Sequence, residues 1–470
     1  MRILIVGAGK VGSSVAATFV SESNDITIVD KDADRIADIQ GTHDLQGIVG
    51  DGSSPSILAE AGAADADMLV AVTASDEVNL AVSLLAAHLF NIPARIARVR
   101  NNELRQFPEI LSKGGFCTTS VIWPEQAITN YIVQLIQYPE ALQVSEFAGG
   151  KAVLISLKVV ANAPMAGQPV EKIRDLLPGK RIRIVSIYRT KYVEDRLTSK
   201  TVINAGDEVY FFVEQENSKE AIKLFRPKIR RSDRIIIAGG DSLGLQLAQA
   251  LDNAETETGG SYNVKIISPD EEQCLYLAQN LSSSVLVLKG DMNDETLFVN
   301  EGIANTDLFI AISGDDENNI LGCLLAKKLG AHRAIALINR ANYLDLAEGT
   351  AIDIALSPTR ATLSDLLRHV RHGDVVSAHV LRRDGAEILE IIAHGTQKNS
   401  KVVGKNIGSI HLPPAVTFCG VIRMMDGEPK VFIAHKEFVI QDGDQLIVFV
   451  GNKKQIPAVE KLFAPSVSFF

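Results

Sequence analysis

The chain has 470 residues, 22% charged and 46% hydrophobic, and its 47 Lys and Arg against 57 Asp and Glu give a formal net charge of −10. At roughly 150 residues per domain, this length predicts about three domains and excludes a small disulfide-held scaffold. The composition excludes a disordered chain, and the acidic balance excludes a basic protein that coats nucleic acid.

The cysteines and the apolar segments indicate a cytosolic chain. The cysteines lie far apart without a C-x-x-C pair, which favours reduced, buried thiols over a zinc knuckle or a disulfide framework; they are Cys117, Cys274, Cys323 and Cys419. No apolar run reaches the roughly 20 residues that a membrane helix needs. The first residues also lack the apolar core and cleavage site of a signal peptide.

Short β-branched runs alternate with amphipathic helical patterns over the first hundred residues. The predicted strands are Ile3–Val6, Ile26–Val29, Gly47–Val49, Met68–Val72 and Ile96–Val99. Such alternation is typical of a parallel sheet with right-handed crossover helices. The sequence therefore predicts an α/β, Rossmann-like, doubly wound domain.

A glycine-rich turn follows the first predicted strand. In Gly7-x-Gly9-x-x-Gly12, the first glycine permits a tight turn, the second a close approach of phosphate oxygens, and the third close packing of helix on strand. The helix N-terminus offers free N–H donors to an anion. Asp30, 18 residues after Gly12, ends the second strand, where its carboxylate can accept hydrogen bonds from an adenosine ribose. The pattern predicts nucleotide binding and disfavours a ribose with a 2′-phosphate.

Loops after the next two strands supply further candidates, since parallel strands end at one edge of the sheet. Asp51 follows the third strand and is either a ligand for the adenine edge or a plain turn residue. Thr73 and Ala74 follow the fourth strand and should reach the same crevice. Asp76 is either a helix N-cap or a ligand.

Positive groups flank the predicted crevice. Lys10 and Val11 lie inside the glycine loop, and Arg98 and Arg100 come from the end of the fifth strand and just beyond. Each cation is either a phosphate contact or a solvated surface charge.

The whole pattern repeats about 240 residues downstream. The paired segments are Ile3–Gly12 with Ile235–Gly244, Ile48–Gly52 with Leu288–Met292, Met68–Thr73 with Leu308–Ser313, Asp76–Asn79 with Asp316–Asn319, and Asn204–Val213 with Ile440–Val450. Each half is therefore a large lobe followed by a smaller lobe. The predicted lobes are 1–138, 139–231, 232–372 with a degenerate nucleotide site, and 373–470; the basic segment Pro227–Asp233 forms the hinge between the halves.

The second copy departs from the first at three candidate positions. Gly9 is answered by Asp241, whose charge opposes a diphosphate, Asp30 by Ser268, and Arg98 by Ile338. Glycines and charged residues remain elsewhere, namely Gly239, Gly244, Asp291 and Arg340. Three outcomes stay open for the second pocket: empty, weakly binding, or adapted to another ligand.

As a set, the glycine loop, Val29–Asp30, Gly50–Asp51, Val72–Thr73, Asp76–Asn79 and the two small lobes resemble the Trk potassium-uptake regulatory family, whose members have tandem RCK domains. The resemblance covers essentially the whole chain. It implies a cytoplasmic protein peripheral to the membrane that binds NAD(H) or ATP and ADP. It also implies control of a separate potassium-transporting membrane subunit of the TrkH or TrkG type, with no nucleic-acid partner.

The family resemblance also implies a ring of chains, most simply a homotetramer, and RCK-C lobes that assemble or bind effectors. Helices at Pro124–Tyr138 and Pro358–His372 correspond to the family's crossover helices. Their apolar stripes fit either a swapped contact or an intrachain core; they are Ile128, Ile132, Leu135 and Ile136, and Leu363, Leu366, Leu367 and Val370.

Other functional classes receive less support. An NAD-dependent oxidoreductase would use the same glycine loop and Asp30, but the small lobes show no His, Lys or Tyr pairing to move a proton beside a nicotinamide. A transcriptional regulator would need a basic recognition helix, and none is evident. His369 and His372 have metal-ligand spacing on a helix, yet no third ligand is evident, so we predict no metal site.

Overall fold

The computed structural model describes residues 1–20, 24–189, 197–254, 259–347, 350–370, 374–382 and 385–464. These residues form two compact units, each built from both halves of the chain. The large-lobe unit contains residues 1–130 and 235–370, and the small-lobe unit contains residues 131–234 and 371–470. Among the described residues, no helix combines the length and the apolar character needed to span a membrane.

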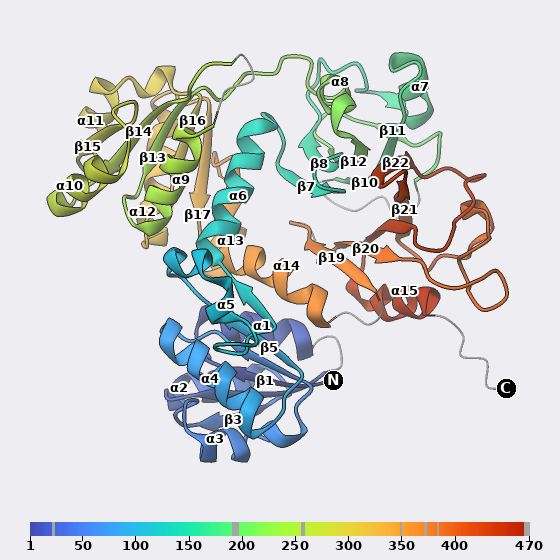
Figure 1. The fold of residues 1–470 in the computed structure, drawn as a ribbon. Coiled ribbons are helices and arrows are strands. Elements are labelled where there is room, and N and C mark those ends of the chain that lie inside the picture. Colours follow the sequence, from blue (N-terminus) through green and yellow to red (C-terminus); the bar gives the residue numbers. More distant parts are fainter. Residues whose placement is uncertain are drawn as a thin grey trace. The chain divides into compact units, whose positions relative to one another are not determined.

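The first large lobe is a six-stranded parallel sheet in the order β3-β2-β1-β4-β5-β6. Figure 1 draws it in blue, with helices around the sheet. Its elements are β1 Arg2–Val6, α1 Lys10–Val20, β2 Asp25–Asp30, α2 Ala33–Thr42, β3 Gln46–Val49, α3 Pro55–Glu60, β4 Met68–Ala71, α4 Asp76–Leu89, β5 Ala94–Arg98, α5 Pro108–Leu111 and β6 Ser120–Ile122. Helix α6, Pro124–Gln137, begins in the large-lobe unit and ends in the small-lobe unit.

The second large lobe repeats this topology with the order β15-β14-β13-β16-β17-β18. Its elements are β13 Arg234–Ala238, α9 Ser242–Asp252, β14 Asn263–Ser268, α10 Glu271–Asn280, β15 Leu286–Lys289, α11 Glu295–Asn300, β16 Leu308–Ala311, α12 Asp316–Lys328, β17 Arg333–Leu337, α13 Ala341–Ala347, β18 Ile354–Leu356 and α14 Pro358–Val370. The predicted tandem doubly wound fold is confirmed. The sequence pattern missed the sixth strand of each sheet, which has only three residues.

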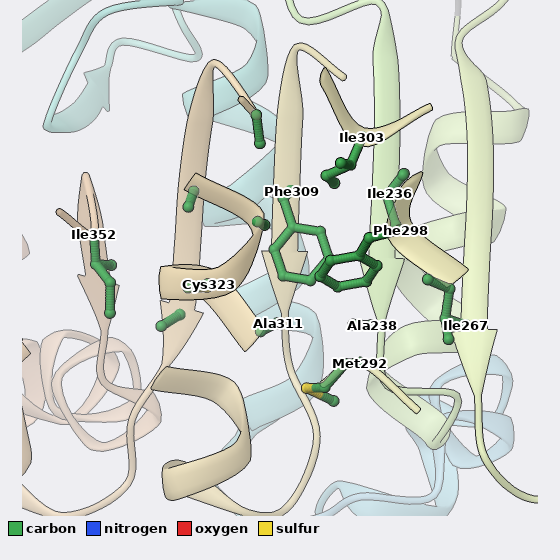
Figure 2. Close-up of a cluster of buried hydrophobic side chains, with 14 of the residues drawn as sticks. Ile236, Ala238, Ile267, Met292, Phe298, Ile303, Phe309, Ala311, Cys323 and Ile352 are labelled. Atoms are coloured by element: carbon green, nitrogen blue, oxygen red, sulfur yellow. The ribbon is translucent and has the colours of Figure 1, made fainter. Parts of the chain in front are cut away.

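Apolar central strands hold each large lobe together. In the second lobe, every residue of β16 is buried, and Phe309 meets Phe298 of α11 edge-on with ring centroids 5.2 Å apart. Figure 2 shows the two rings beside residues from β13 and α12, including Ala238 and Cys323. Parallel strands read as continuous apolar runs because helices cover both faces of their sheet.

The small lobes are antiparallel sheets with a shared core. The first has the order β10-β12-β8-β7 and the second β19-β20-β23-β21-β22. Phe147, Phe212 and Tyr210 of the first lobe lie in one buried cluster with Ile388 and Phe449 of the second. The elements of the first are β7 Gln143–Phe147, β8 Ala152–Lys158, β9 Gln168–Pro169, α7 Ile173–Leu176, β10 Ile182–Tyr188, β11 Val202–Ile203, β12 Glu208–Glu214 and α8 Ser218–Lys223, and those of the second are β19 Val375–Val380, β20 Glu387–Ile392, β21 Val416–Met425, β22 Glu428–Ile433, β23 Gln445–Val450 and α15 Ile456–Phe463.

The cysteines agree only in part with the sequence expectation. All four are free thiols, and Cys117, Cys323 and Cys419 are buried, but Cys274 is only half-buried. Burial raises the pKa of the Cys419 thiol to about 12, which makes that thiol chemically inert.

The predicted crossover helices bury their apolar stripes. Ile132, Leu135, Leu366 and Leu367 have no exposed surface, whereas the side chain of Val370 lies outside the described residues. Helix α14, from the second half of the chain, packs against α1 and β6 of the first. The sequence left open a swapped contact or an intrachain core. For α14 the structure shows an intrachain contact between the two copies.

Candidate nucleotide site

Three glycines of the first lobe form a loop between β1 and α1, and each meets a different constraint. Gly7 has a φ of +109°, and a Cβ there would lie 2.9 Å from the Thr73 nitrogen. A Cβ on Gly12 would lie 1.8 Å from the Gly7 carbonyl oxygen. A Cβ on Gly9 would meet no atom within 4 Å. The fold thus requires Gly7 and Gly12, whereas only a group approaching from outside the protein would require Gly9.

Asp30, at the end of β2, fixes the conformation of this loop. One carboxylate oxygen accepts a hydrogen bond from the Ala8 nitrogen at 2.6 Å, and the other accepts one from the Asp32 nitrogen at 3.0 Å. Each carboxylate oxygen has a second lone pair, so both can still accept ribose hydroxyls. The side chain is only half-buried and faces the crevice beside the loop.

Asp51 lies after β3, the neighbour of β2, and pairs with Lys31, a lysine that no sequence motif marked. Lys31 Nζ lies 3.1 Å from Asp51 Oδ2. Hydrogen bonds from the Ser53 hydroxyl and backbone nitrogen, together with Lys31, lower the pKa of Asp51 to about 2. The adjacency of β2 and β3 is the signal that could have placed Lys31 here.

Thr73 is held at the end of β4 by a buried asparagine of α4. Its backbone nitrogen and its hydroxyl both donate to Asn79 Oδ1 at 2.8 Å, and Asn79 Nδ2 donates to the carbonyl oxygens of Thr73 and Arg98. Asn79 therefore connects the ends of β4 and β5.

Asp76 is not the N-cap of α4. Ser75 is the N-cap and accepts a hydrogen bond from the Val78 nitrogen, while Asp76 accepts hydrogen bonds from the Arg100 and Asn101 nitrogens at 2.9 Å. The N-cap reading of Asp76 is wrong.

Arg98 is a buried cation with an unused donor. It is 8% exposed, and its Nη2 donates to the Thr73 carbonyl at 3.1 Å. Its Nε has no hydrogen-bond partner among the described residues. Burial and the neighbouring Arg100 lower the pKa of Arg98 to about 10, so it stays charged at neutral pH. Such an orphan buried donor is unusual in a native protein, and other atoms of Arg98 line the cavity described next.

These residues surround one cavity of about 1000 Å³. Nearly all of the predicted site residues line it, namely Gly7, Gly9, Lys10, Val11, Asp30, Asp51, Thr73, Ala74, Arg98 and Arg100. Gly12 does not, because it packs against Gly7 below the loop. Lys31, Arg35 and Glu125 also line the cavity, and the second large lobe contributes one of its walls, although no sequence motif marked these residues.

The equivalent loop of the second lobe keeps the glycines that the fold requires. Gly239 has a φ of +130°, and a Cβ on Gly244 would lie 1.9 Å from the Gly239 carbonyl oxygen. Asp241, in place of Gly9, caps α9 by accepting from the Gly244 nitrogen at 3.2 Å. The carboxylate thus uses a donor that a phosphate would need.

The ribose position of the second lobe is closed by side chains. Ser268, in place of Asp30, has no exposed surface and donates to Gln273 Oε1 at 2.6 Å. A Cβ on Gly240 would lie 2.9 Å from Leu277 Cδ1 and 3.1 Å from Gln273 Oε1. The strand ends correct two predicted correspondences: Leu337, not Ile338, takes the place of Arg98, since each accepts from the buried asparagine of its lobe. Asn339 takes the place of Arg100, and Arg340, the counterpart of Asn101, pairs with Glu317 at 2.8 Å. The second site thus lacks the open crevice of the first.

Metal ligands do not cluster in the described part of the chain, where no group of three or more His, Cys, Asp or Glu could hold an ion. His372 lies outside the described residues, so the structure leaves the predicted His369–His372 interpretation untested.

Comparisons with known proteins agree with this architecture. The TrkA-N domain model matches residues 3–122 and 235–358, and the TrkA-C domain model matches residues 154–226 and 396–464. The chain is 41% identical over 470 residues to the Trk system potassium uptake protein TrkA of Vibrio alginolyticus, with 100% of both chains covered. It is 40% identical over 471 residues to the Halomonas elongata protein of that name, again with 100% of both covered.

Among solved structures, the GsuK channel bound to NAD has a similar fold, with a TM-score of 0.58 at 17% identity, covering 98% of this chain and 79% of that one. Both large lobes and both small lobes thus have their counterparts in full-length relatives. The chain belongs to the TrkA family of Trk system potassium uptake proteins.

Proposed function

We propose that this protein is the nucleotide-binding regulatory subunit of a Trk-type potassium uptake system, and that it senses its ligand in the first large lobe. The observation that carries the proposal is the open cavity above Gly9, lined by the carboxylate of Asp30 and by the buried cation Arg98. Family membership supplies the transport system. The protein acts in the cytoplasm, on the inner face of the membrane, as a ring of chains beside a TrkH- or TrkG-like subunit.

The ligand is an adenine nucleotide, either NAD(H) or ATP and ADP. The α1 N-terminus and Lys10 bind the phosphates, and Asp30 accepts hydrogen bonds from the adenosine ribose. Asp51 and Lys31 border the adenine end. GsuK, which shares this fold, has been solved with NAD bound.

Regulation requires that the ligand bind two arrangements of the lobes with different affinity, because equal binding shifts no equilibrium. The cavity supports such a difference, since both large lobes line it. A ligand that contacts both walls stabilises one spacing between the lobes. That spacing then biases the ring and, through it, the membrane subunit.

The test is a calorimetric titration of the full chain with ATP, ADP, NAD and NADH, repeated on Asp30→Ala. We expect one site per chain, weakened at least about tenfold in the variant, because hydrogen bonds to a carboxylate are strong. Two equal sites would contradict the closed second lobe, and no binding would remove the sensing function. Potassium uptake by cells carrying either form then links binding to transport.

An oxidoreductase is the alternative. The described residues that line the cavity include no histidine, tyrosine or cysteine, although Lys10, Lys31 and Glu125 could exchange a proton with a substrate. The discriminating assay follows nicotinamide oxidation with common hydroxy and amino acids, and sustained turnover would favour the enzyme.

A further inference from the structure

The cavity of the first large lobe has two chemically different ends. Asp30 and Asp51 follow β2 and β3, on one side of the glycine loop, whereas Arg98 ends β5 and Glu125 follows β6, on the other side. A nucleotide whose ribose binds Asp30 and whose phosphates lie at the loop therefore extends toward Arg98 and Glu125. The group beyond the second phosphate, a third phosphate or a second riboside, would lie at that far end.

The second large lobe contributes an acidic residue to this far end. Asp241 and Leu243, at the start of α9, line the same cavity as Arg98, Arg100 and Glu125. Burial raises the pKa of Glu125, and the charge of Asp241 raises it further, whereas the two arginines lower it. Asp241 is therefore close enough to Glu125 to act on it electrostatically, although its carboxylate also caps α9. Part of the Asp241 side chain is exposed, yet burial of the rest raises the pKa of its carboxyl group.

We infer that Asp241 of the second lobe is a specificity determinant of the first nucleotide pocket, where it disfavours a third phosphate relative to the uncharged second riboside of a dinucleotide. The inference rests on the proposed nucleotide binding and adds the ligand class: a dinucleotide such as NAD(H) over ATP.

The charges at the far end account for this preference. Glu125, Asp241 and the nearby Asp76 offset Arg98 and Arg100, so these groups have no net positive charge to attract another phosphate. Arg98 and Arg100, which line this end, can donate to a neutral ribose or carboxamide oxygen, and such a group adds no charge. The aspartate that occupies the phosphate position of the second loop thus also acts on the ligand of the first.

The experiment compares Asp241→Asn with the wild-type full chain by calorimetric titration with ATP and NAD at low ionic strength. Asparagine caps a helix as well as aspartate, so α9 should keep its N-cap. Asp291→Asn is the matched control: it removes one negative charge from the same lobe, at a residue that does not line the cavity. Thermal unfolding of each variant verifies folding.

We expect Asp241→Asn to bind ATP roughly threefold to tenfold more tightly, the scale of one charge acting across a partly solvated cavity, and NAD less than twofold more tightly. The gain should shrink in high salt, and Asp291→Asn should change neither affinity. Equal changes for ATP and NAD, or an unchanged ATP affinity, would overturn the inference while leaving nucleotide binding intact. Failure of the wild type to bind either ligand would instead overturn the proposed function and this inference with it.

Discussion

The two large lobes have the same sheet order. In each lobe a fully buried asparagine connects the ends of the fourth and fifth strands: Asn79 in the first and Asn319 in the second. The lobes differ at the crevice: Gly9 leaves open space where Asp241 caps a helix, and Asp30 faces a cavity where Ser268 is buried. The comparison separates residues that the fold requires from residues that a ligand requires. Duplication kept the first group in both copies and the second group in one.

The largest expected effect tests the shared part of the comparison. Gly12→Ala and Gly244→Ala each place a Cβ within 2 Å of a carbonyl oxygen, at 1.8 Å and 1.9 Å. Each should lower the free energy of unfolding of its lobe by about 3 kcal/mol, because the helix must move off the strand. Urea unfolding measures it, by the fluorescence of Trp123 in the first lobe and by circular dichroism for the second. A large loss in one copy and none in the other would show that the two loops are not equivalent.

The next effect tests the position at which the loops differ. Gly9→Asp copies the second loop into the first, and the new side chain meets open space rather than protein, so the unfolding free energy should change little. Nucleotide affinity should fall on the order of 100-fold, because a carboxylate then opposes the phosphates. Gly9→Asn, with the same shape and no charge, is the control and should lose less. If Gly9→Asp kept wild-type affinity in a titration, the phosphates could not lie at this loop.

A reciprocal exchange tests the ribose position. Asp30→Ser should weaken nucleotide binding about tenfold or more, since a charged acceptor is lost. Ser268→Asp should add no second site, because Gln273 and Leu277 already fill the space above Gly240. It should instead reduce stability, as a carboxylate would be buried beside Gln273 Oε1. A calorimetric end point of two sites per chain for Ser268→Asp would contradict the closed pocket.

Much of the fold could be predicted from the sequence because its signals are local. Continuous apolar runs such as Met68–Ala71 mark buried parallel strands, and the duplication fixes the second lobe once the first is read. Ser120–Ile122 was missed because three residues are too few to show periodicity.

The candidate site was harder to predict because it depends on contacts between distant segments. Lys31 and Asp51 meet only because β2 and β3 are neighbours, and Glu125 follows the missed strand. Asp241 was predicted as a loss in its own lobe, whereas the packing of the two copies also places it on the wall of the first cavity. No local pattern in one lobe carries that information.

The smallest expected effect concerns Asp51. Its counterpart in the second lobe is Asp291, and the position that corresponds to Lys31 is occupied there by Pro269. The folded pKa of Asp51, about 2, is below its ordinary value of 3.8. The Ser53 hydrogen bonds and, to a smaller extent, Lys31 therefore stabilise the protein above pH 3.8 and lose that effect as pH falls toward 2. The side chain is 45% exposed, so Asp51→Asn should cost less than about 1 kcal/mol near neutral pH. Urea unfolding between pH 6 and 3 measures the difference in unfolding free energy between Asp51→Asn and the wild type, which should shrink at the acidic end. The control Asp291→Asn removes no ion pair with a lysine among the described residues, so its difference from the wild type should be smaller. A difference that grew as pH fell would contradict the assigned direction of the pKa shift, and with it the stabilising effect of the hydrogen bonds and the ion pair around Asp51.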